Sequence, residues 1–204
     1  MPHPRQCVTN LIVLAATAGV FAGPAAANDG PSFDCSSVET GSIEAMICND
    51  AELAALDRAL AAAYALAAAK ATNEHPPVLK AEQRGWIKGR DDCWKAEDER
   101  ACIVDAYRLR TAELQARYRL VQPTGPVFYV CNGNPADQVV ATFFATDPAS
   151  AIAERGDQVS FMVLEPTASG SKYVGRNETL WEHHGQATIQ WGYDAPEMRC
   201  VATQ

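Results

Sequence analysis

The sequence predicts an α+β protein of two domains, a disulfide-linked three-helix bundle followed by a small antiparallel β-barrel. Three observations lead to this fold class. Apolar residues in the first half recur every three or four positions, the period of an amphipathic helix. Short β-prone runs separated by turn residues fill the second half. Six of the seven cysteines follow a predicted export signal, and an even number is typical of a disulfide framework in an exported chain.

The N-terminal segment has the three parts of a secretory signal. A basic residue precedes an apolar run over residues 11–21, and Ala25-Ala26-Ala27 forms an A-x-A cleavage site. The run is shorter than the roughly 20 residues that a membrane span requires. Cys7 lies before the run, which argues against lipid attachment. We therefore expect a signal peptide over residues 1–27 and a mature chain that begins at Asn28, has no membrane span, and is periplasmic or secreted.

The mature chain is acidic. Removing the signal peptide leaves 177 residues with 25 acidic and 16 basic side chains, a formal charge of −9. This charge argues against a nucleic-acid partner, because contact with phosphates requires basic side chains. A cationic protein partner is compatible with it, since opposite charges speed encounter. The simpler interpretation of the charge alone is that it keeps the protein in solution.

The order of the six remaining cysteines suggests that each pairs with its nearest neighbour. The expected disulfides are Cys35–Cys48, Cys93–Cys102 and Cys131–Cys200. A zinc site is the alternative, but no Cys-x-x-Cys spacing supports it. We predict no metal and no cofactor.

Residues 28–120 are predicted to form the helical domain, after an irregular lead-in over 28–40 that is rich in Gly, Pro, Ser and Asp. The first helix begins after Cys48. The second follows Pro76-Pro77, because proline is compatible with the first turn of a helix, and the third follows Cys102. The side chains at helical spacing are Leu53, Leu56, Leu60, Tyr64 and Ala67; Leu79, Trp86, Ile87 and Trp94; and Ile103, Tyr107, Leu114, Tyr118 and Val121. Three helices of this size form a small antiparallel bundle.

Residues 127–204 are predicted to form the barrel, after a linker over residues 121–126. Two prolines and a glycine in that linker interrupt both helix and sheet. The β-prone runs beyond it cover residues 127–131, 138–144, 159–164, 180–181 and 187–191. Runs this short and evenly spaced indicate an antiparallel barrel or sandwich, of which we expect the barrel. A disulfide between Cys131 and Cys200 would join its first strand to its last.

Asp57, Arg90 and Arg110 are candidates for a functional polar cluster in the helical domain. We expect a structural role instead, because a buried carboxylate paired with arginine commonly fixes the register of helices. Trp86 and Trp94 follow the helical spacing and are expected in the core.

The candidate functional segment is a loop around Ser169. A small hydroxyl residue beside a glycine can enter a narrow pocket, because Gly170 has no side chain and accepts positive φ values. Tyr173, Trp181 and Ala187 are expected to form the scaffold that holds the loop still.

The spacing Ser/Thr-x-Ser-Gly-x-x-Tyr, seven residues, Trp-x-x-x-x-x-Ala resembles the membrane-bound inhibitors of c-type lysozyme, over residues 127–204. In that family the serine and a lysine two residues after the tryptophan enter the lysozyme cleft, which implies roles for Ser169 and His183. The expected lysozyme-binding residues are Ser169, Gly170, Lys172, Tyr173, His183 and His184. The family's Trp-x-Lys-Gly reads Trp181-Glu182-His183-His184 in this chain.

The first domain resembles the N-terminal domain of LprI-type lysozyme-inhibitor lipoproteins, over residues 33–120. The residues that carry this resemblance are Asp34-Cys35, Ile47-Cys48, Leu56-Asp57, Gln83-Arg84-Gly85-Trp86, Arg90-Asp91, Cys93, Cys102 and Arg110.

Together these resemblances imply an exported protein that plugs the active-site cleft of c-type lysozyme and protects a bacterial envelope. Two other classes stay open: an envelope binding module without inhibitory activity, and a cell-wall hydrolase. We expect no enzymatic activity, because nucleophile-elbow, His-Glu-x-x-His and phosphate-loop motifs are absent. The adjacent His183 and His184 do not indicate a metal, since neighbouring positions on a strand face opposite sides. The oligomeric state is not predicted.

Overall fold

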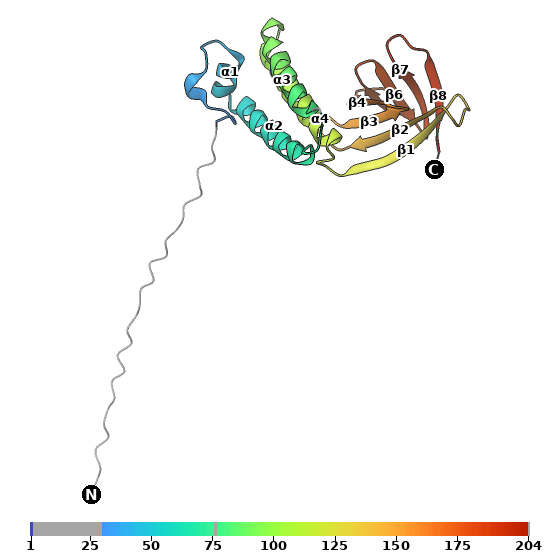
Figure 1. The fold of residues 1–204 in the computed structure, drawn as a ribbon, viewed down its shortest axis with the longest axis horizontal. Helices are drawn as coiled ribbons and strands as arrows, with labels where there is room; N and C mark the ends of the chain where they lie inside the picture. Colours follow the sequence, from blue (N-terminus) through green and yellow to red (C-terminus); the bar gives the residue numbers. More distant parts are fainter. Residues whose placement is uncertain (2–29, 76, 204) are drawn as a thin grey trace.

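A computed structural model describes residues 1, 30–75 and 77–203 of the chain. A helical domain is followed by a closed eight-stranded barrel, and the two lie side by side (Figure 1). The predicted cleavage point of the signal peptide lies outside the described residues. Within the described ranges, no helix is both long enough and apolar enough to span a bilayer.

The helical domain contains four α-helices where the sequence predicted three. In chain order its elements are η1 (Cys35–Ser37), α1 (Ile43–Asn49), α2 (Ala51–Lys70), α3 (Val78–Asp91), η2 (Asp92–Lys95) and α4 (Glu99–Arg117). The three predicted helices correspond to α2, α3 and α4. The prediction missed α1 because its seven residues are too few to show a periodic pattern. A local contact begins this helix: the Ser42 hydroxyl accepts a hydrogen bond from the Ala45 N–H.

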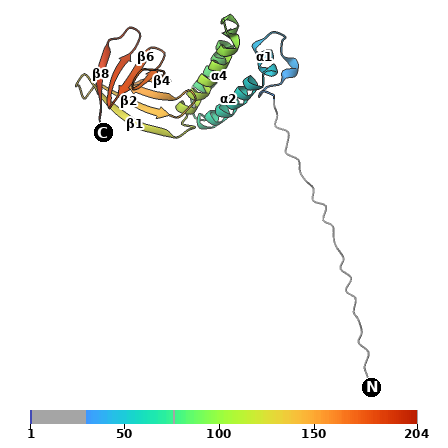
Figure 2. The same ribbon diagram turned by 180° about the vertical axis from the view of Figure 1, so that it is seen from behind.

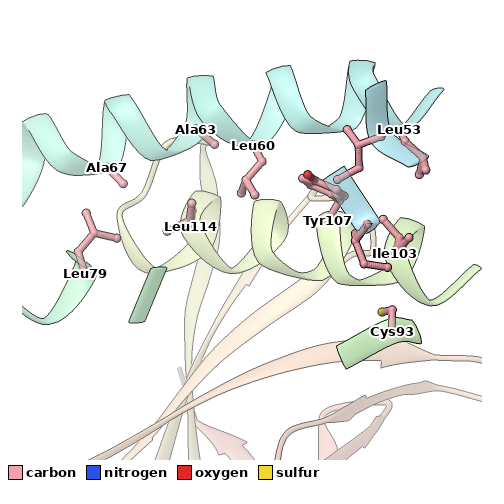
Figure 3. Packing of buried hydrophobic residues seen from close by; sticks show 11 residues of the cluster. Leu53, Leu60, Ala63, Ala67, Leu79, Cys93, Ile103, Tyr107 and Leu114 are labelled. Carbon is pink, nitrogen blue, oxygen red and sulfur yellow. The ribbon is translucent and has the colours of Figure 1, made fainter. Parts of the chain in front are cut away.

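The helical core lies mainly between α2 and α4, and Figure 3 shows their apolar side chains facing one another. Leu53 and Ile103 are fully buried there, as is Leu114, and Leu79 of α3 closes one end. Each such side chain contributes about 1.5–3 kcal/mol through burial. Trp86 packs against this cluster as predicted. The core prediction for Trp94 is wrong: its side chain is 65% exposed, because α3 ends at Asp91 and the helical spacing no longer applies.

A buried polar network crosses the helical core and includes Asp57 and Arg90, two of the three predicted cluster residues. The third, Arg110, pairs instead with Glu113. The Tyr107 hydroxyl donates to Asp57 Oδ1 at 2.8 Å and accepts from Arg90 Nη1 at 3.0 Å. Arg90 also pairs with Glu44 of α1 and with Asp91. The network therefore links all four α-helices.

The barrel is a continuous up-and-down sheet in which each strand pairs with the next and β8 closes onto β1. Its strands are β1 (Pro123–Cys131), β2 (Gln138–Phe144), β3 (Ser150–Arg155), β4 (Gln158–Glu165), β5 (Ser171–Val174), β6 (Glu178–His183), β7 (Gln186–Trp191) and β8 (Glu197–Thr203). The predicted linker is partly wrong, because β1 already begins at Pro123. Strand β8 pairs with β1 only from Phe128 onward, so the two prolines lie beyond the ladder on that side, where a missing N–H is tolerated.

The three predicted disulfides are present: Cys35–Cys48, Cys93–Cys102 and Cys131–Cys200. The first joins η1 to α1, and the second joins η2 to α4. Cys131 and Cys200 are direct cross-strand partners on β1 and β8. This third disulfide therefore fixes the pairing that closes the barrel.

Helix α4 lies between α2 and the barrel wall, in contact with β3 and β4 (Figure 2). An ion pair of 2.5 Å joins Arg108 of α4 to Asp147, in the connection between β2 and β3. A groove of about 650 Å³ lies between the domains, with Leu109 and Arg117 on the helical side and Val159 and Arg176 on the barrel side. The helical domain thus covers part of the outer wall of the barrel.

Candidate functional site

Two connections at one end of the barrel bring the predicted site residues together. In an up-and-down barrel, the β4–β5 loop (residues 166–170) and the β6–β7 turn emerge at the same end. Strands β5 and β6 pair directly, with Ser171 opposite Glu182. Ser169 therefore lies close to His183, although the two are 14 positions apart in the sequence.

Gly170 allows the loop to lie directly against β6. Its φ is +70°, and a Cβ at this position would lie 2.2 Å from the backbone oxygen of Glu182 and 3.1 Å from Cδ2 of His183. No side chain fits at such distances. The glycine expected from the sequence is therefore required for two reasons, the backbone conformation and the close approach.

The Ser169 backbone is held from two sides. The Trp181 indole Nε1–H donates to the Ser169 carbonyl at 2.9 Å, and the Thr167 hydroxyl donates to the same oxygen at 3.3 Å. The Ser169 hydroxyl has no hydrogen-bond partner within the described part of the chain, and the residue is exposed. The loop thus presents a free hydroxyl on a fixed backbone.

The β6–β7 turn consists of His184 and Gly185, both with positive φ, +53° and +77°. Two such residues make a tight hairpin whose twist matches that of the flanking strands. Its geometry is fixed by the Gly185 N–H, which donates to Glu182 Oε1 at 2.9 Å, and by the Gly185 carbonyl, which accepts from the Ala202 N–H at 2.8 Å. His183 and His184 are exposed, with ring centroids 4.2 Å apart in an edge-on arrangement.

Comparison with known proteins finds a similar family for each domain. Residues 35–114 match the family "Lysozyme inhibitor LprI", and residues 129–198 match "Membrane-bound lysozyme-inhibitor of c-type lysozyme", or MliC. The match to the LprI model thus lies in the helical domain, and the match to the MliC model lies in the barrel. Both resemblances drawn from motif spacing are thereby confirmed.

Similarity to curated relatives extends through both domains. The "Lipoprotein LprI" of Mycobacterium tuberculosis, strain H37Rv, is 29% identical over 185 residues, which cover 90% of this chain and 91% of the relative. The protein of the same name from Mycobacterium bovis matches equally. The matched stretch is long enough to include residues of both the helical domain and the barrel.

In the barrel domain, the predicted residues divide between two faces of the sheet. Lys172 and Trp181 are cross-strand partners on the outer wall, and Trp181 is 43% exposed. Tyr173 and Ala187 face the interior, where the Tyr173 ring packs against Phe143 with centroids 5.2 Å apart. Trp181 therefore supports the loop through its hydrogen bond and not as part of the core.

The mouth of the barrel contains one residue that the sequence did not single out, Tyr129. Tyr129 of β1 lies beside Tyr173 and Glu182 around one cavity. Burial, with the negative charge of Glu182 nearby, raises the pKa of Tyr129 to about 12 and also raises the pKa of Tyr173. The alternation of inward and outward residues along β1 was the available signal for Tyr129, but it requires the strand register. Among the described residues, no cluster of His, Cys, Asp and Glu suitable for a metal ion occurs.

Proposed function

We propose that this protein is an exported inhibitor of c-type lysozyme that inserts Ser169 and His183 into the active-site cleft. The observation that carries the proposal is that the MliC match spans both the fixed Ser169 loop and the adjoining His183 turn. The LprI match adds a second domain from a family described as lysozyme inhibitors. The mechanism is competitive occlusion, with no chemistry performed by the inhibitor.

The chemistry of the target explains why hydroxyl and imidazole groups are suitable. A c-type lysozyme uses two carboxyl groups, one protonated as the general acid and one ionised. The Ser169 hydroxyl can donate to one carboxyl group and accept from the other, and an imidazole N–H of His183 supplies a further donor. Because the loop backbone is already fixed, little conformational entropy is lost when it binds.

Charge supports the same partner. Residues 127–204 contain nine acidic and four basic side chains, a net charge of −5. The partner that we propose is cationic, so long-range attraction would speed the encounter. The acidic charge of the barrel domain is therefore compatible with the lysozyme partner that the matched families indicate.

We further propose that the protein acts in the periplasm or outside the cell, after cleavage near Ala27. Three disulfides in one chain are typical of oxidising compartments and rare in the cytosol. Protection of peptidoglycan would take place in the same compartments.

The test is inhibition of hen egg-white lysozyme by the mature chain, measured as the rate of bacterial cell-wall lysis. We expect competitive inhibition that Ser169→Ala weakens by roughly 1–3 kcal/mol, the cost of losing a buried hydrogen bond. Ser37→Ala, at an exposed serine of the helical domain, is the matched control and should inhibit like the wild type. Absence of inhibition at micromolar excess would overturn the proposal. Release of sugars from peptidoglycan by this protein alone would instead indicate a hydrolase.

A further inference from the structure

A cavity of about 400 Å³ opens at the mouth of the barrel, directly beside the Ser169 loop. Its lining contains one carboxylate, that of Glu182, and no basic side chain. Two phenol groups share the cavity with it, those of Tyr129 and Tyr173. The other lining residues are Val127, Phe143, Ser171, Gly185 and Ala202. The cavity is therefore apolar along its walls and negative at one point.

Glu182 faces the inside of the barrel. Successive side chains of a strand point to opposite faces, and Trp181 and His183 on either side of it are exposed while Leu180 is fully buried. Glu182 Oε1 accepts the hydrogen bond from the Gly185 N–H. Its second carboxylate oxygen has no hydrogen bond or ion pair to any residue that the structure describes. A half-buried carboxylate thus retains a free acceptor.

The phenol groups are unpartnered too. Tyr129 is only 2% exposed, yet neither its hydroxyl nor that of Tyr173 forms a hydrogen bond within the described ranges. Tyr173 is partly buried, and neither hydroxyl is sealed from solvent, so both remain open to a group that enters the cavity. Three oxygen atoms of a single site, on β1, β5 and β6, are therefore free to bond a ligand. The carboxylate oxygen only accepts, and each phenol can donate or accept.

We propose that this cavity receives the cationic end of a lysine or arginine side chain from the surface of lysozyme, an inference that rests on the proposed function. In this partly buried site, the carboxylate of Glu182 would stabilise a cation. An anion would be repelled by Glu182 and would find no basic group in the cavity lining. The rings of Tyr173 and Phe143 add attraction for a cation. Val127 and Ala202 provide apolar contact for the alkyl stem of such a side chain.

The cavity and the Ser169 loop would together give the inhibitor two points of attachment with opposite polarity. The loop offers hydrogen-bond donors to the carboxyl groups of the enzyme, and the barrel mouth accepts one of its cations. Both lie at the same end of the barrel, where Ser171 of the cavity lining directly follows the Ser169 loop in sequence. This arrangement fixes the orientation of the inhibitor on its target, which a single inserted loop does not.

Glu182→Gln tests the proposal, because glutamine retains a carbonyl oxygen for the Gly185 N–H and removes only the charge. Glu154→Gln on β3 is the matched control, since it changes the net charge equally at an exposed position. Affinity for hen egg-white lysozyme is measured by calorimetry at low and at physiological salt. We expect Glu182→Gln to weaken binding at least tenfold more than the control at both salt concentrations, because a buried pair is screened little. Equal affinities of the two variants would overturn the inference while leaving the proposed function intact.

A second measurement does not depend on lysozyme. Butylammonium is titrated into the mature protein and followed by NMR of the tyrosine rings, with 1-butanol as the uncharged control. We expect saturable shifts at Tyr129 and Tyr173 with butylammonium alone, and loss of these shifts in Glu182→Gln. Equal responses to the two probes, or no response to either, would overturn the cation site. Failure of the wild type to inhibit lysozyme would overturn the proposed function, and the ammonium titration would still decide whether the cavity binds a cation.

Discussion

Replacement of Gly170 by alanine is the sharpest test of the loop geometry. The φ of +70° would place an alanine in the left-handed region, which costs roughly 1–2 kcal/mol. In addition, the new Cβ would lie 2.2 Å from the Glu182 backbone oxygen. Since real Cβ contacts are not shorter than 3.0 Å, the loop and β6 must separate by at least 0.8 Å.

This displacement acts on the residue that we propose to enter lysozyme. Ser169 is bonded through its carbonyl to Trp181 on β6, so separation of the loop from β6 strains or breaks that bond. A misplacement on the order of 1 Å can cost about 100-fold where geometry is critical. We therefore expect Gly170→Ala to weaken the inhibition of lysozyme by roughly 10- to 100-fold.

Gly133→Ala is the control, because Gly133 has the same φ of +70° and no atom within 4 Å of its virtual Cβ. Both variants should lose stability through the same backbone strain, measured by urea unfolding, and Gly170→Ala should lose more because of its clash with Glu182. Only Gly170→Ala should lose affinity, measured by calorimetry with hen egg-white lysozyme. If both variants bind as tightly as the wild type, the close approach of the loop to β6 does not position the inhibitory residue.

Three further predictions concern stability. Replacing both Cys131 and Cys200 by alanine removes a cross-link with a sequence separation of 69 and should destabilise the barrel by about 4 kcal/mol in the chain-entropy model, measured by urea unfolding. Tyr107→Phe removes the hydroxyl that bridges two charged side chains and should destabilise the helical domain by about 1–3 kcal/mol in a calorimetric scan, without changing affinity for lysozyme. The third concerns alkaline pH. The pKa of Tyr129 is raised to about 12 in the folded protein. The stabilisation that comes from its protonated phenol is therefore complete below the unfolded-state pKa of about 10 and is lost as pH rises through 12. Between these pH values, the free energy of unfolding of the wild type should thus fall by on the order of 1 kcal/mol more than that of Tyr129→Phe.

Each of these predictions has a defined failure. An unchanged urea midpoint without Cys131–Cys200 would show that pairing of β1 with β8 needs no cross-link. A Tyr107→Phe protein as stable as the wild type would mean that its hydroxyl bonds contribute nothing net. Parallel pH curves for Tyr129→Phe and the wild type would show that burial of this phenol does not favour its protonated form.

The sequence predicted the parts of the fold that depend on local pattern. The long helices α2, α3 and α4 have clear apolar periodicity, and all three disulfides join neighbouring cysteines in sequence. Strands β3 and β5 were missed, because β3 is alanine-rich and β5 has only four residues. No predicted run covers β8, although Cys200 was expected in the last strand. The sequence could not distinguish a closed barrel from a sandwich, because closure depends on the pairing of β1 with β8, which lie at opposite ends of the domain in sequence.

The candidate site was predictable where spacing alone carries information. The distances in sequence between Ser169, Tyr173, Trp181 and Ala187 identified the family that residues 129–198 match. Spacing does not show which face of a strand a residue occupies relative to other strands. The cavity formed by Glu182 with Tyr129 of β1 therefore emerges only once the register of the barrel is known.

The two adjacent histidines have different positions, and this difference separates their roles. His183 ends β6 and pairs with Gln186, so its direction is set by the sheet. His184 has a φ of +53°. The family pattern has a glycine at this position, and glycine adopts such a conformation without strain. Gly185 at the next position provides the second positive φ, so the hairpin forms despite the substitution. His184→Gly should consequently stabilise the barrel by up to about 1 kcal/mol in urea unfolding and preserve inhibition, whereas His183→Ala should weaken inhibition. If His184→Gly abolishes inhibition while His183→Ala retains it, the residue that enters the cleft is His184.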